Sequence, residues 1–286
     1  MSSSGRTGAL ESLIIVADDY GLAPGVNRSI RKLLSAERID GTGCMTLFSD
    51  WKVEAAALKA LCESREIEAG LHLTLTDFDP MSGRNALGQR AVMPSVNDLI
   101  KASYRRTVDF AAVERELDAQ LAAFIEAMDA IPAYIDGHQH VHFLPAVRAW
   151  LKKRAPLFAE FGVVPWLRGA PSVLAASGLK IRAKTAVVAM IAAGFNRTMR
   201  KSGYIIEGPL VGFYDWNNPQ AFEPMLLRLR DKGPANGVLM CHPGSIDATL
   251  RKRDGLIDAR EVEYAVLSTL GTASPPEESS AMRSLA

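Results

Sequence analysis

LIIVADDYG, at residues 13–21, is the stretch that decides the fold. Its first five residues, Leu13 to Ala17, form a short apolar run typical of a strand buried on both faces of a parallel sheet. The run stops at Asp18 and Asp19, and no glycine-rich phosphate-binding fingerprint follows it. That absence argues against an open, doubly wound nucleotide-binding sheet and favours a barrel.

Outward from this strand, strand-like and helix-like segments alternate. Strands that alternate with helices pair in parallel through right-handed crossovers. We therefore predict an α/β fold with a (β/α) barrel-like architecture, in which about seven parallel strands lie inside outer helices. The barrel would resemble a TIM barrel but could be irregular or incomplete. Further strands are expected near residues 43–48, 68–76, 133–136, 163–167 and 237–241, and helices near 25–36, 52–63, 113–128, 145–154, 174–202 and 260–270.

The two ends of the chain differ in composition from its middle. Residues 1–12 are small and polar, and residues 271–286 are rich in Ser, Pro and Glu, so we expect a flexible N-terminus and a disordered tail. Residues 13–270 are expected to form a single catalytic domain, because a chain that is 48% hydrophobic has ample apolar material for one large core. A Pro-, Gly- and Asn-rich loop at 77–96 is long enough to act as a lid or binding loop.

Charge and cysteine content exclude several classes of protein. A balance of 33 basic against 32 acidic residues lacks the basic excess that nucleic-acid binding requires. The 3 cysteines lie far apart and form no CxxC pair, which favours a reducing, cytoplasmic location. The apolar stretch at 186–195 is too short to span a bilayer. Because basic residues flank it over 182–201, it is interpreted as a cover for the barrel, a peripheral membrane contact or a homodimer contact.

Residues able to bind a metal gather at the ends of the predicted strands. In parallel α/β folds, functional sites are built at the carboxyl ends of the strands, so these side chains are expected to converge on one rim with the Asp18–Asp19 pair. Imidazole and carboxylate groups bind zinc, manganese, iron, cobalt or nickel, and with water molecules magnesium. All 5 histidines lie within or just after apolar runs: His72, His138, His140, His142 and His242.

The spacing of these residues suggests a division of roles. Neighbours in an extended segment point to opposite sides, so of Asp18 and Asp19 one is expected to bind the metal, while the other acts as a base or orients a histidine. The three histidines of 138–142 would share a face if extended, but three ligands from one strand would crowd a metal, so we expect one or two. A helix cap would explain the aspartates alone, and a hydrogen-bond network, a surface metal trap or a turn would explain single histidine motifs. A metal site explains them together.

Four ordered motifs resemble the YdjC/ChbG family of carbohydrate deacetylases. They lie at residues 15–27, 70–76, 135–142 and 241–244, and residues 260–264 resemble the family's closing Arg-Glu-x-Glu. The similarity is colinear over about residues 12 to 270, with Tyr20 where phenylalanine is common. The resemblance implies a (β/α) barrel-like fold and removal of an acetyl group from an N-acetylated sugar.

The resemblance also implies roles for single residues. Asp19, His72 and His138 match the ligands of one divalent metal ion, for which zinc and magnesium are the two candidates. Asp18 matches the catalytic base, and His242 matches the general acid that protonates the departing amine. The expected products are acetate and an amino sugar.

Other residues are expected to support the site or contact the substrate. His140 and His142 fall in the same motif as a ligand and are placed beside the ligands or on the substrate side. Arg168, after the predicted strand at 163–167, would hold the base or the substrate, with a surface salt bridge as the alternative. Tyr214 and Trp216 would form a sugar-stacking edge, with core packing as the alternative for Trp216.

Three functions remain open from the sequence. The first is a metal-dependent N-deacetylase acting on an N-acetylated amino sugar. The second is a metal-dependent hydrolase of another amide or ester, and the third is a non-catalytic metal- or carbohydrate-binding protein on the same scaffold. Asp18 distinguishes them, because a binding protein needs ligands but no base.

Overall fold

The computed structural model describes residues 13–255 and 257–270. Its core is one sheet of eight strands in the order β6-β5-β4-β3-β2-β1-β8-β7, in which every neighbouring pair is parallel. The strands are β1 (Leu13–Tyr20), β2 (Gly41–Cys44), β3 (Glu68–Leu73), β4 (Tyr134–Gly137), β5 (Trp166–Arg168), β6 (Ile206–Glu207), β7 (Leu210–Val211) and β8 (Gly237–Cys241).

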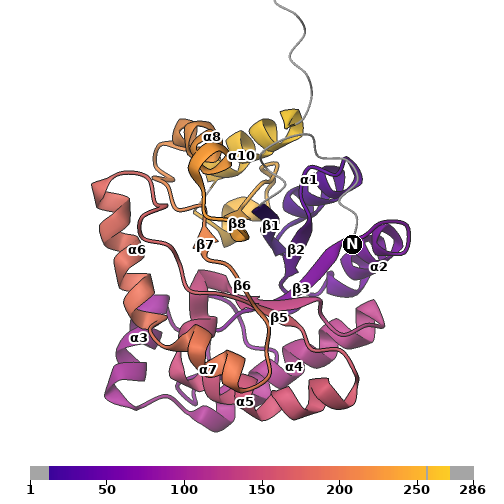
Figure 1. Ribbon diagram of the computed structural model, residues 1–286. Helices are drawn as coiled ribbons and strands as arrows, with labels where there is room; N and C mark the ends of the chain where they lie inside the picture. The colour runs from indigo at the N-terminus through magenta and orange to yellow at the C-terminus, as the bar shows by residue number, and fades with distance from the viewer. Residues whose placement is uncertain (1–12, 256, 271–286) are drawn as a thin grey trace, which may run out of the picture.

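The sheet curls into a nearly closed barrel, which confirms the predicted architecture (Figure 1). β6 and β7 stand at opposite ends of the strand order but are separated by only residues 208–209 in the chain. A parallel bridge between Pro171 and Leu210 connects the segment after β5 to β7. The barrel therefore closes through an irregular contact rather than through a regular strand pair.

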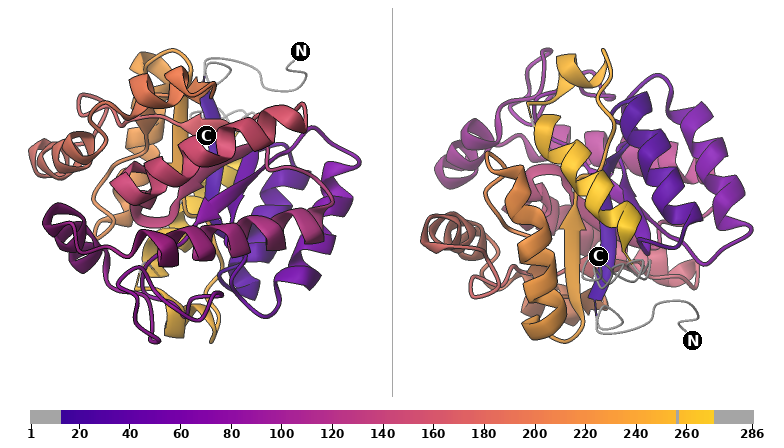
Figure 2. Two further views of the ribbon diagram at one scale, coloured as in Figure 1. Left: turned by 90° about the horizontal axis from the view of Figure 1, so that it is seen from below. Right: turned by 90° about the horizontal axis from the view of Figure 1, so that it is seen from above.

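Helices surround the strands on the outside (Figure 2). They are α1 (Pro24–Ser35), α2 (Trp51–Cys62), α3 (Val96–Arg105), α4 (Phe110–Met128), α5 (Pro145–Glu160), α6 (Leu179–Ile191), α7 (Phe195–Lys201), α8 (Phe222–Lys232), α9 (Leu250–Arg253) and α10 (Ile257–Thr269), with 3-10 turns η1 (His138–Phe143) and η2 (Pro219–Ala221).

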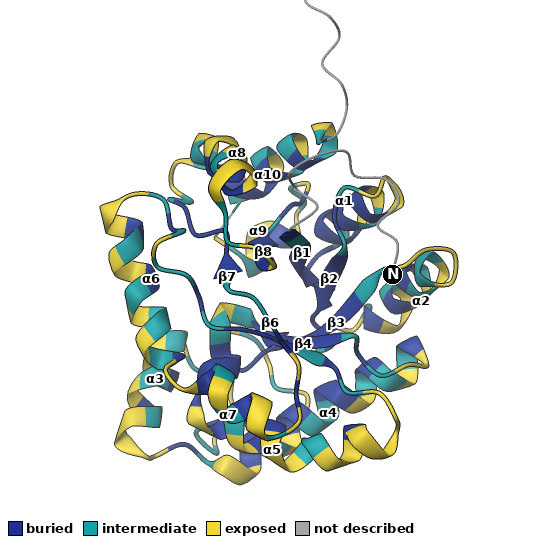
Figure 3. Ribbon diagram, in the orientation of Figure 1, coloured by how far each residue is buried: buried dark blue, intermediate teal, exposed yellow. Residues whose placement is uncertain are grey.

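Apolar periodicity explains how these helices pack. In α4, the stripe of Val113, Leu117, Leu121, Phe124 and Met128 is buried, as the sequence predicts. The strands are buried on both faces, while the outer helices expose one side to solvent (Figure 3). The apolar run of β1 pairs with β2 on one side and with β8 on the other, which places β1 inside the sheet, third from the end of the strand order formed by β7.

Several expected boundaries are wrong. The strand predicted at 43–48 is β2 and ends at Cys44, and the strand predicted at 163–167 is β5, which begins only at Trp166. The helical stretch at 174–202 is two helices, α6 and α7, separated by a turn at Gly194. The sequence analysis did not anticipate α3, β6, β7, α8 and α9.

Two other expectations concern the ends of the chain and the membrane. Residues 1–12 and 271–286, expected to be flexible or disordered, lie outside the described residues. Among the helices described here, none combines the length and the apolar character needed to cross a bilayer.

Candidate functional site

The Asp18–Asp19 pair lies at the carboxyl end of β1, where both side chains are buried. The backbone of Asp19 is left-handed (φ 69°), a conformation that aspartate tolerates better than most residues. The two carboxylates consequently have different partners, as their expected division of roles requires. The helix-cap alternative is wrong, because α1 begins after Ala23 without any side-chain capping bond.

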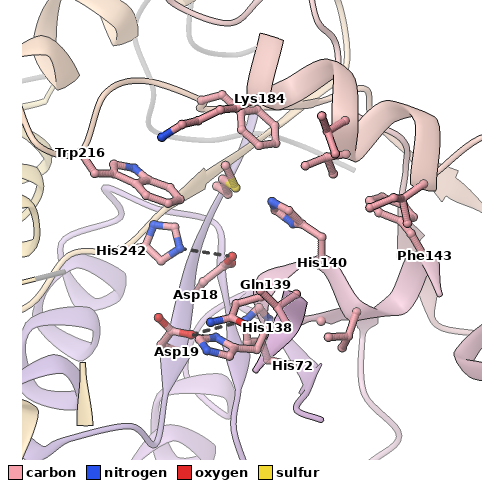
Figure 4. A pocket seen from close by; sticks show the side chains of 18 of the residues that line it. Asp18, Asp19, His72, His138, Gln139, His140, Phe143, Lys184, Trp216 and His242 are labelled. Atoms are coloured by element: carbon pink, nitrogen blue, oxygen red, sulfur yellow. Dashed lines mark hydrogen bonds and ion pairs between the residues drawn. The ribbon is translucent and has the colours of Figure 1, made fainter. Parts of the chain in front are cut away.

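Asp19 meets two histidines at the floor of a cavity (Figure 4). Its Oδ1 lies 3.0 Å from Nδ1 of His138 and 3.4 Å from Nε2 of His72. One ligand atom from each of the three residues lies within 4.8 Å of the other two. The structure therefore brings together the three side chains for which the family resemblance implies a role as metal ligands.

Asp136 orients His72 from behind. The two side chains are 2.6 Å apart between Asp136 Oδ1 and His72 Nδ1, which leaves Nε2 of the ring facing Asp19. A carboxylate behind an imidazole in this way is the usual support of a metal-binding histidine. Gly43 allows the ring to sit here, because a Cβ at that position would lie only 3.0 Å from His72 Nδ1.

Two buried arginines hold the carboxylates in place. Arg168 on β5 donates to both oxygens of Asp18, at 2.8 and 2.6 Å, and lies 2.7 Å from Asp136 Oδ2. Of the alternatives for Arg168, the structure shows the bond to Asp18, and its complete burial rules out a surface salt bridge. Arg260 on α10 donates to Asp19 Oδ2 at 2.6 Å and also pairs with Asp254.

This network shifts the pKa values of its members. Burial alone would raise the pKa of Asp18, but Arg168, His72 and His242 together outweigh it and hold that pKa well below its usual range. For Asp19, burial is likewise outweighed by Arg260 and by His138. Burial would lower the pKa of His72, but the neighbouring carboxylates raise it to about 10. In the absence of a cation, the cluster therefore keeps a proton on His72.

His242 follows β8 and faces the same floor. Its Nε2 lies 3.9 Å from Asp18 Oδ2. Its backbone N–H donates to Glu263 on α10, and the hydroxyl of Tyr214 donates to the other oxygen of that carboxylate at 2.6 Å. The ring of Trp216 meets His242 edge to face, with 5.3 Å between centroids. Tyr214 is therefore connected to His242 through Glu263, and Trp216 contacts the ring of His242 directly.

The HQHVH segment is not extended, so its three histidines do not share one face. Residues 138–143 form the 3-10 turn η1, with left-handed backbone at Gln139 and His140 (φ 49° and 62°). The three histidines therefore diverge. His138 faces Asp19, His140 lines the cavity, and His142 is fully buried with its ring 3.9 Å from that of Phe143.

The cavity above the floor has a volume of about 490 Å³. Its polar end is formed by the aspartates and histidines, and helices α3 and α6 contribute an apolar wall. Burial lowers the pKa of His140 to about 3, so its ring stays neutral at the border between the two ends. Two buried atoms, Nδ1 of His140 and Nε1 of Trp216, have no hydrogen-bond partner within residues 13–255 and 257–270. Both residues line the cavity, although these two atoms are themselves buried.

Three further residues belong to the site but have no predicted role there: Asp136, Arg260 and Glu263. Asp136 ends a predicted strand two residues before His138, which was a usable signal. Arg260 and Glu263 were noted only as part of a family-like segment. Nothing local shows that a helix near the end of the chain returns to the first strand.

A nearly closed parallel barrel with a buried aspartate–histidine cluster at its strand ends defines a class of α/β proteins whose chemistry takes place at the rim. Within that class, the family model described as YdjC-like protein matches residues 12–273, and the chain belongs to this family.

Similar proteins extend this result. A chitooligosaccharide deacetylase of Enterobacter sp. (strain 638) is 28% identical over 250 residues, 84% of each chain. One from Yersinia pestis (strain Pestoides F) is 28% identical over 279 residues, which is 91% of this chain and 92% of the relative. A human carbohydrate deacetylase is 32% identical over 140 residues, 47% of this chain and 42% of the relative.

A solved structure supports the fold alone. A proposed cellobiose-phosphate cleavage protein of Enterococcus faecalis V583 superposes with a TM-score of 0.60 at 20% identity, covering 90% of each chain.

Proposed function

We propose that this protein is a metal-dependent deacetylase that hydrolyses the N-acetyl group of an amino sugar to an amine and acetate. The observation that carries the proposal is the Asp19–His72–His138 cluster beside Asp18 and His242 at the floor of one cavity. Relatives named as chitooligosaccharide and carbohydrate deacetylases support the reaction and the class of substrate.

The donor set fits a divalent cation. Asp19, His72 and His138 supply one carboxylate and two imidazoles, a set that suits zinc, with magnesium as the alternative. His72 is supported from behind by Asp136, as metal-binding histidines are. A divalent cation held there would polarise an amide carbonyl as a Lewis acid and lower the pKa of a water molecule.

Asp18 is suited to accept the proton of the attacking water. Its low pKa keeps it ionised at neutral pH, and the two bonds from Arg168 fix its orientation. As the water oxygen attacks the carbonyl carbon, its proton passes to Asp18. Its neighbour across the cavity floor is His242, 3.9 Å away.

His242 is suited to protonate the leaving nitrogen. The carbon–nitrogen bond breaks readily only when that nitrogen receives a proton, and a protonated imidazole is a donor of the right strength near neutral pH. Glu263 holds the backbone of His242, and Trp216 limits the movement of its ring. His140 and Trp216 line the cavity and would contact the sugar or its acetamido group.

Acetate release from a panel of N-acetylated mono- and oligosaccharides tests the proposal. The protein is first stripped with a chelator, and single divalent metals are then added back. We expect no release after chelation and restored release with one metal, which would identify both metal and substrate. Tight cation binding without acetate release from any sugar would contradict the proposal and indicate a binding protein or a different acyl substrate.

A further inference from the structure

A second cavity adjoins the one over the proposed catalytic floor. It has a volume of about 500 Å³ and is bounded by the ends of α3, α5, α6 and α7. Phe143, Leu144 and Ile191 line both cavities, so the two lie next to each other along these residues. Together they extend from the aspartate–histidine cluster between α3 and α6, with many apolar side chains in their lining. We call the two cavities together the α3–α6 groove.

The first part of the α3–α6 groove offers a long chain mainly apolar contacts. From α6 it is lined by Ile181, Val187 and Val188, and from α3 by Val96 and Ile100. The hydroxyl groups of a second or third sugar would lose water against this wall without gaining hydrogen bonds, which costs free energy. An alkyl chain has no hydrogen bonds to water to lose in the same place, and its transfer out of water is favourable in free energy.

The outer end of the α3–α6 groove exposes large apolar side chains. Tyr104 is 74% exposed, Met190 66% and Val187 50%, and all three line one of the two cavities. Leu179, at the start of α6, is 85% exposed. The position of α6 on the outside of the barrel is visible in Figures 1 and 3. Apolar residues clustered at the mouth of a groove indicate an apolar ligand or surface rather than solvent.

The charges around the groove suit an amphiphile drawn from an anionic lipid surface. Residues 161–206 contain no aspartate or glutamate. Lys184 lines the first cavity (Figure 4), and Arg148 and Lys152 line the second. Basic side chains beside exposed apolar ones attract anionic lipid headgroups. The cations of α6 and α7 are Lys180, Arg182, Lys184, Arg197, Arg200 and Lys201.

We propose that the substrate is an amphiphilic glycoconjugate, in which the N-acetylated amino sugar is the head group and a long apolar aglycone occupies the α3–α6 groove. This inference rests on the proposed function. The sugar would lie over the aspartate–histidine cluster, with His140 at the junction. The aglycone would leave past Ile191 and Met190.

A chain-length series tests this inference with the metal-loaded protein. The probes are the methyl, butyl and octyl glycosides of N-acetylglucosamine, used below their micellar concentrations. Fully N-acetylated chitobiose and chitotriose serve as substrates without an apolar aglycone. We expect kcat/KM for acetate release to rise by up to about fourfold for each added methylene that is buried. A flat series, or a preference for chitotriose over the octyl glycoside, would overturn the inference while leaving deacetylation intact.

Binding of octyl glucoside, which has no acetyl group, separates this inference from the proposed function. Calorimetry is expected to show binding much tighter than that of methyl glucoside, whether or not acetate is released from any substrate. Equal binding of the two glucosides would refute the apolar groove. Tighter octyl binding together with no deacetylation would uphold the groove and refute the reaction.

Two matched substitutions locate the effect. Val187→Ser removes an exposed apolar side chain from the groove and is expected to reduce the octyl-to-methyl ratio of kcat/KM several-fold. Val53→Ser makes the same change at a 73% exposed position on α2, outside the groove, and is expected to leave the ratio unchanged. Equal ratios in the two variants would show that α6 does not contact the aglycone.

Discussion

The two halves of the barrel differ in regularity and in what they contribute. Strands β8, β1, β2, β3 and β4 are four to eight residues long and carry, at their ends, all the proposed ligands and both proposed proton-transfer groups. Strands β5, β6 and β7 are two or three residues long, and the chain between them forms α6 and α7 beside the α3–α6 groove. We call these the catalytic half and the recognition half.

The difference shows where positional accuracy is needed. Proton transfer and metal binding require side chains fixed within a fraction of an ångström, which long, fully paired strands provide. Recognition of a chain needs only shape and apolar surface, which short strands and an outlying helix can supply. Arg168 connects the halves, because its backbone lies on β5 and its guanidinium pairs with Asp18 and Asp136.

The largest effect is expected from removing the base in the catalytic half. Asp18→Asn keeps the size of the side chain but cannot accept the water proton, so kcat should fall by about 10²- to 10⁴-fold. Steady-state acetate release measures the loss, and calorimetry should show that a divalent cation still binds. Asp129→Asn, at an exposed position after α4, is the matched control. Retained turnover in Asp18→Asn would remove Asp18 from the role of base.

Arg168, which connects the two halves, is expected to make a large contribution to the free energy of unfolding. Arg168→Gln leaves Asp18 and Asp136 buried without their cation, which should lower the free energy of unfolding by about 3–5 kcal/mol. Urea denaturation measures this. The control is Arg65→Gln, because Arg65 pairs with Glu37 at the surface, where ion pairs contribute about 0–1 kcal/mol. If both variants unfold at the same urea concentration, the buried network does not hold the halves together.

A pH dependence of stability that reverses when a cation binds is expected within the catalytic half. His72 has a pKa of about 10, above its ordinary value of 6.5, so its protonation stabilises the metal-free fold fully below about pH 6.5. This stabilisation is lost as pH rises towards about 10. A cation must displace that proton, so the stabilisation that it provides should grow over the same range. Thermal unfolding with and without chelator measures how stability changes with pH in the metal-free and the cation-bound protein. His72→Gln should weaken both pH dependences.

Much of the catalytic half could be predicted from the sequence. The apolar run of 13–17 and the histidines after other apolar runs are local signals, and they predicted the rim at which the proposed ligands lie. The assignment of single residues as ligands came from the family resemblance and stays a prediction. The directions of the three histidines in HQHVH could not be predicted, because they depend on the left-handed backbone of Gln139 and His140, which the sequence pattern does not show.

The recognition half was harder to predict for a physical reason. Strands of two residues, such as β6 and β7, have no periodicity, since they are fixed by pairing with distant segments. The same holds for Arg260 and Glu263, whose roles depend on contacts with Asp19 and His242 that no local pattern records.

The bond between Arg260 and Asp19 joins residues 241 positions apart. Asp19 belongs to the first strand that the structure describes, and Arg260 to the last helix. During synthesis, the first strand leaves the ribosome long before that helix exists. The Asp19 carboxylate therefore lacks its guanidinium partner until α10 has been translated, and a chain that stops short of α10 never gains it. Translation through α10 is thus itself a condition for an ordered aspartate–histidine cluster.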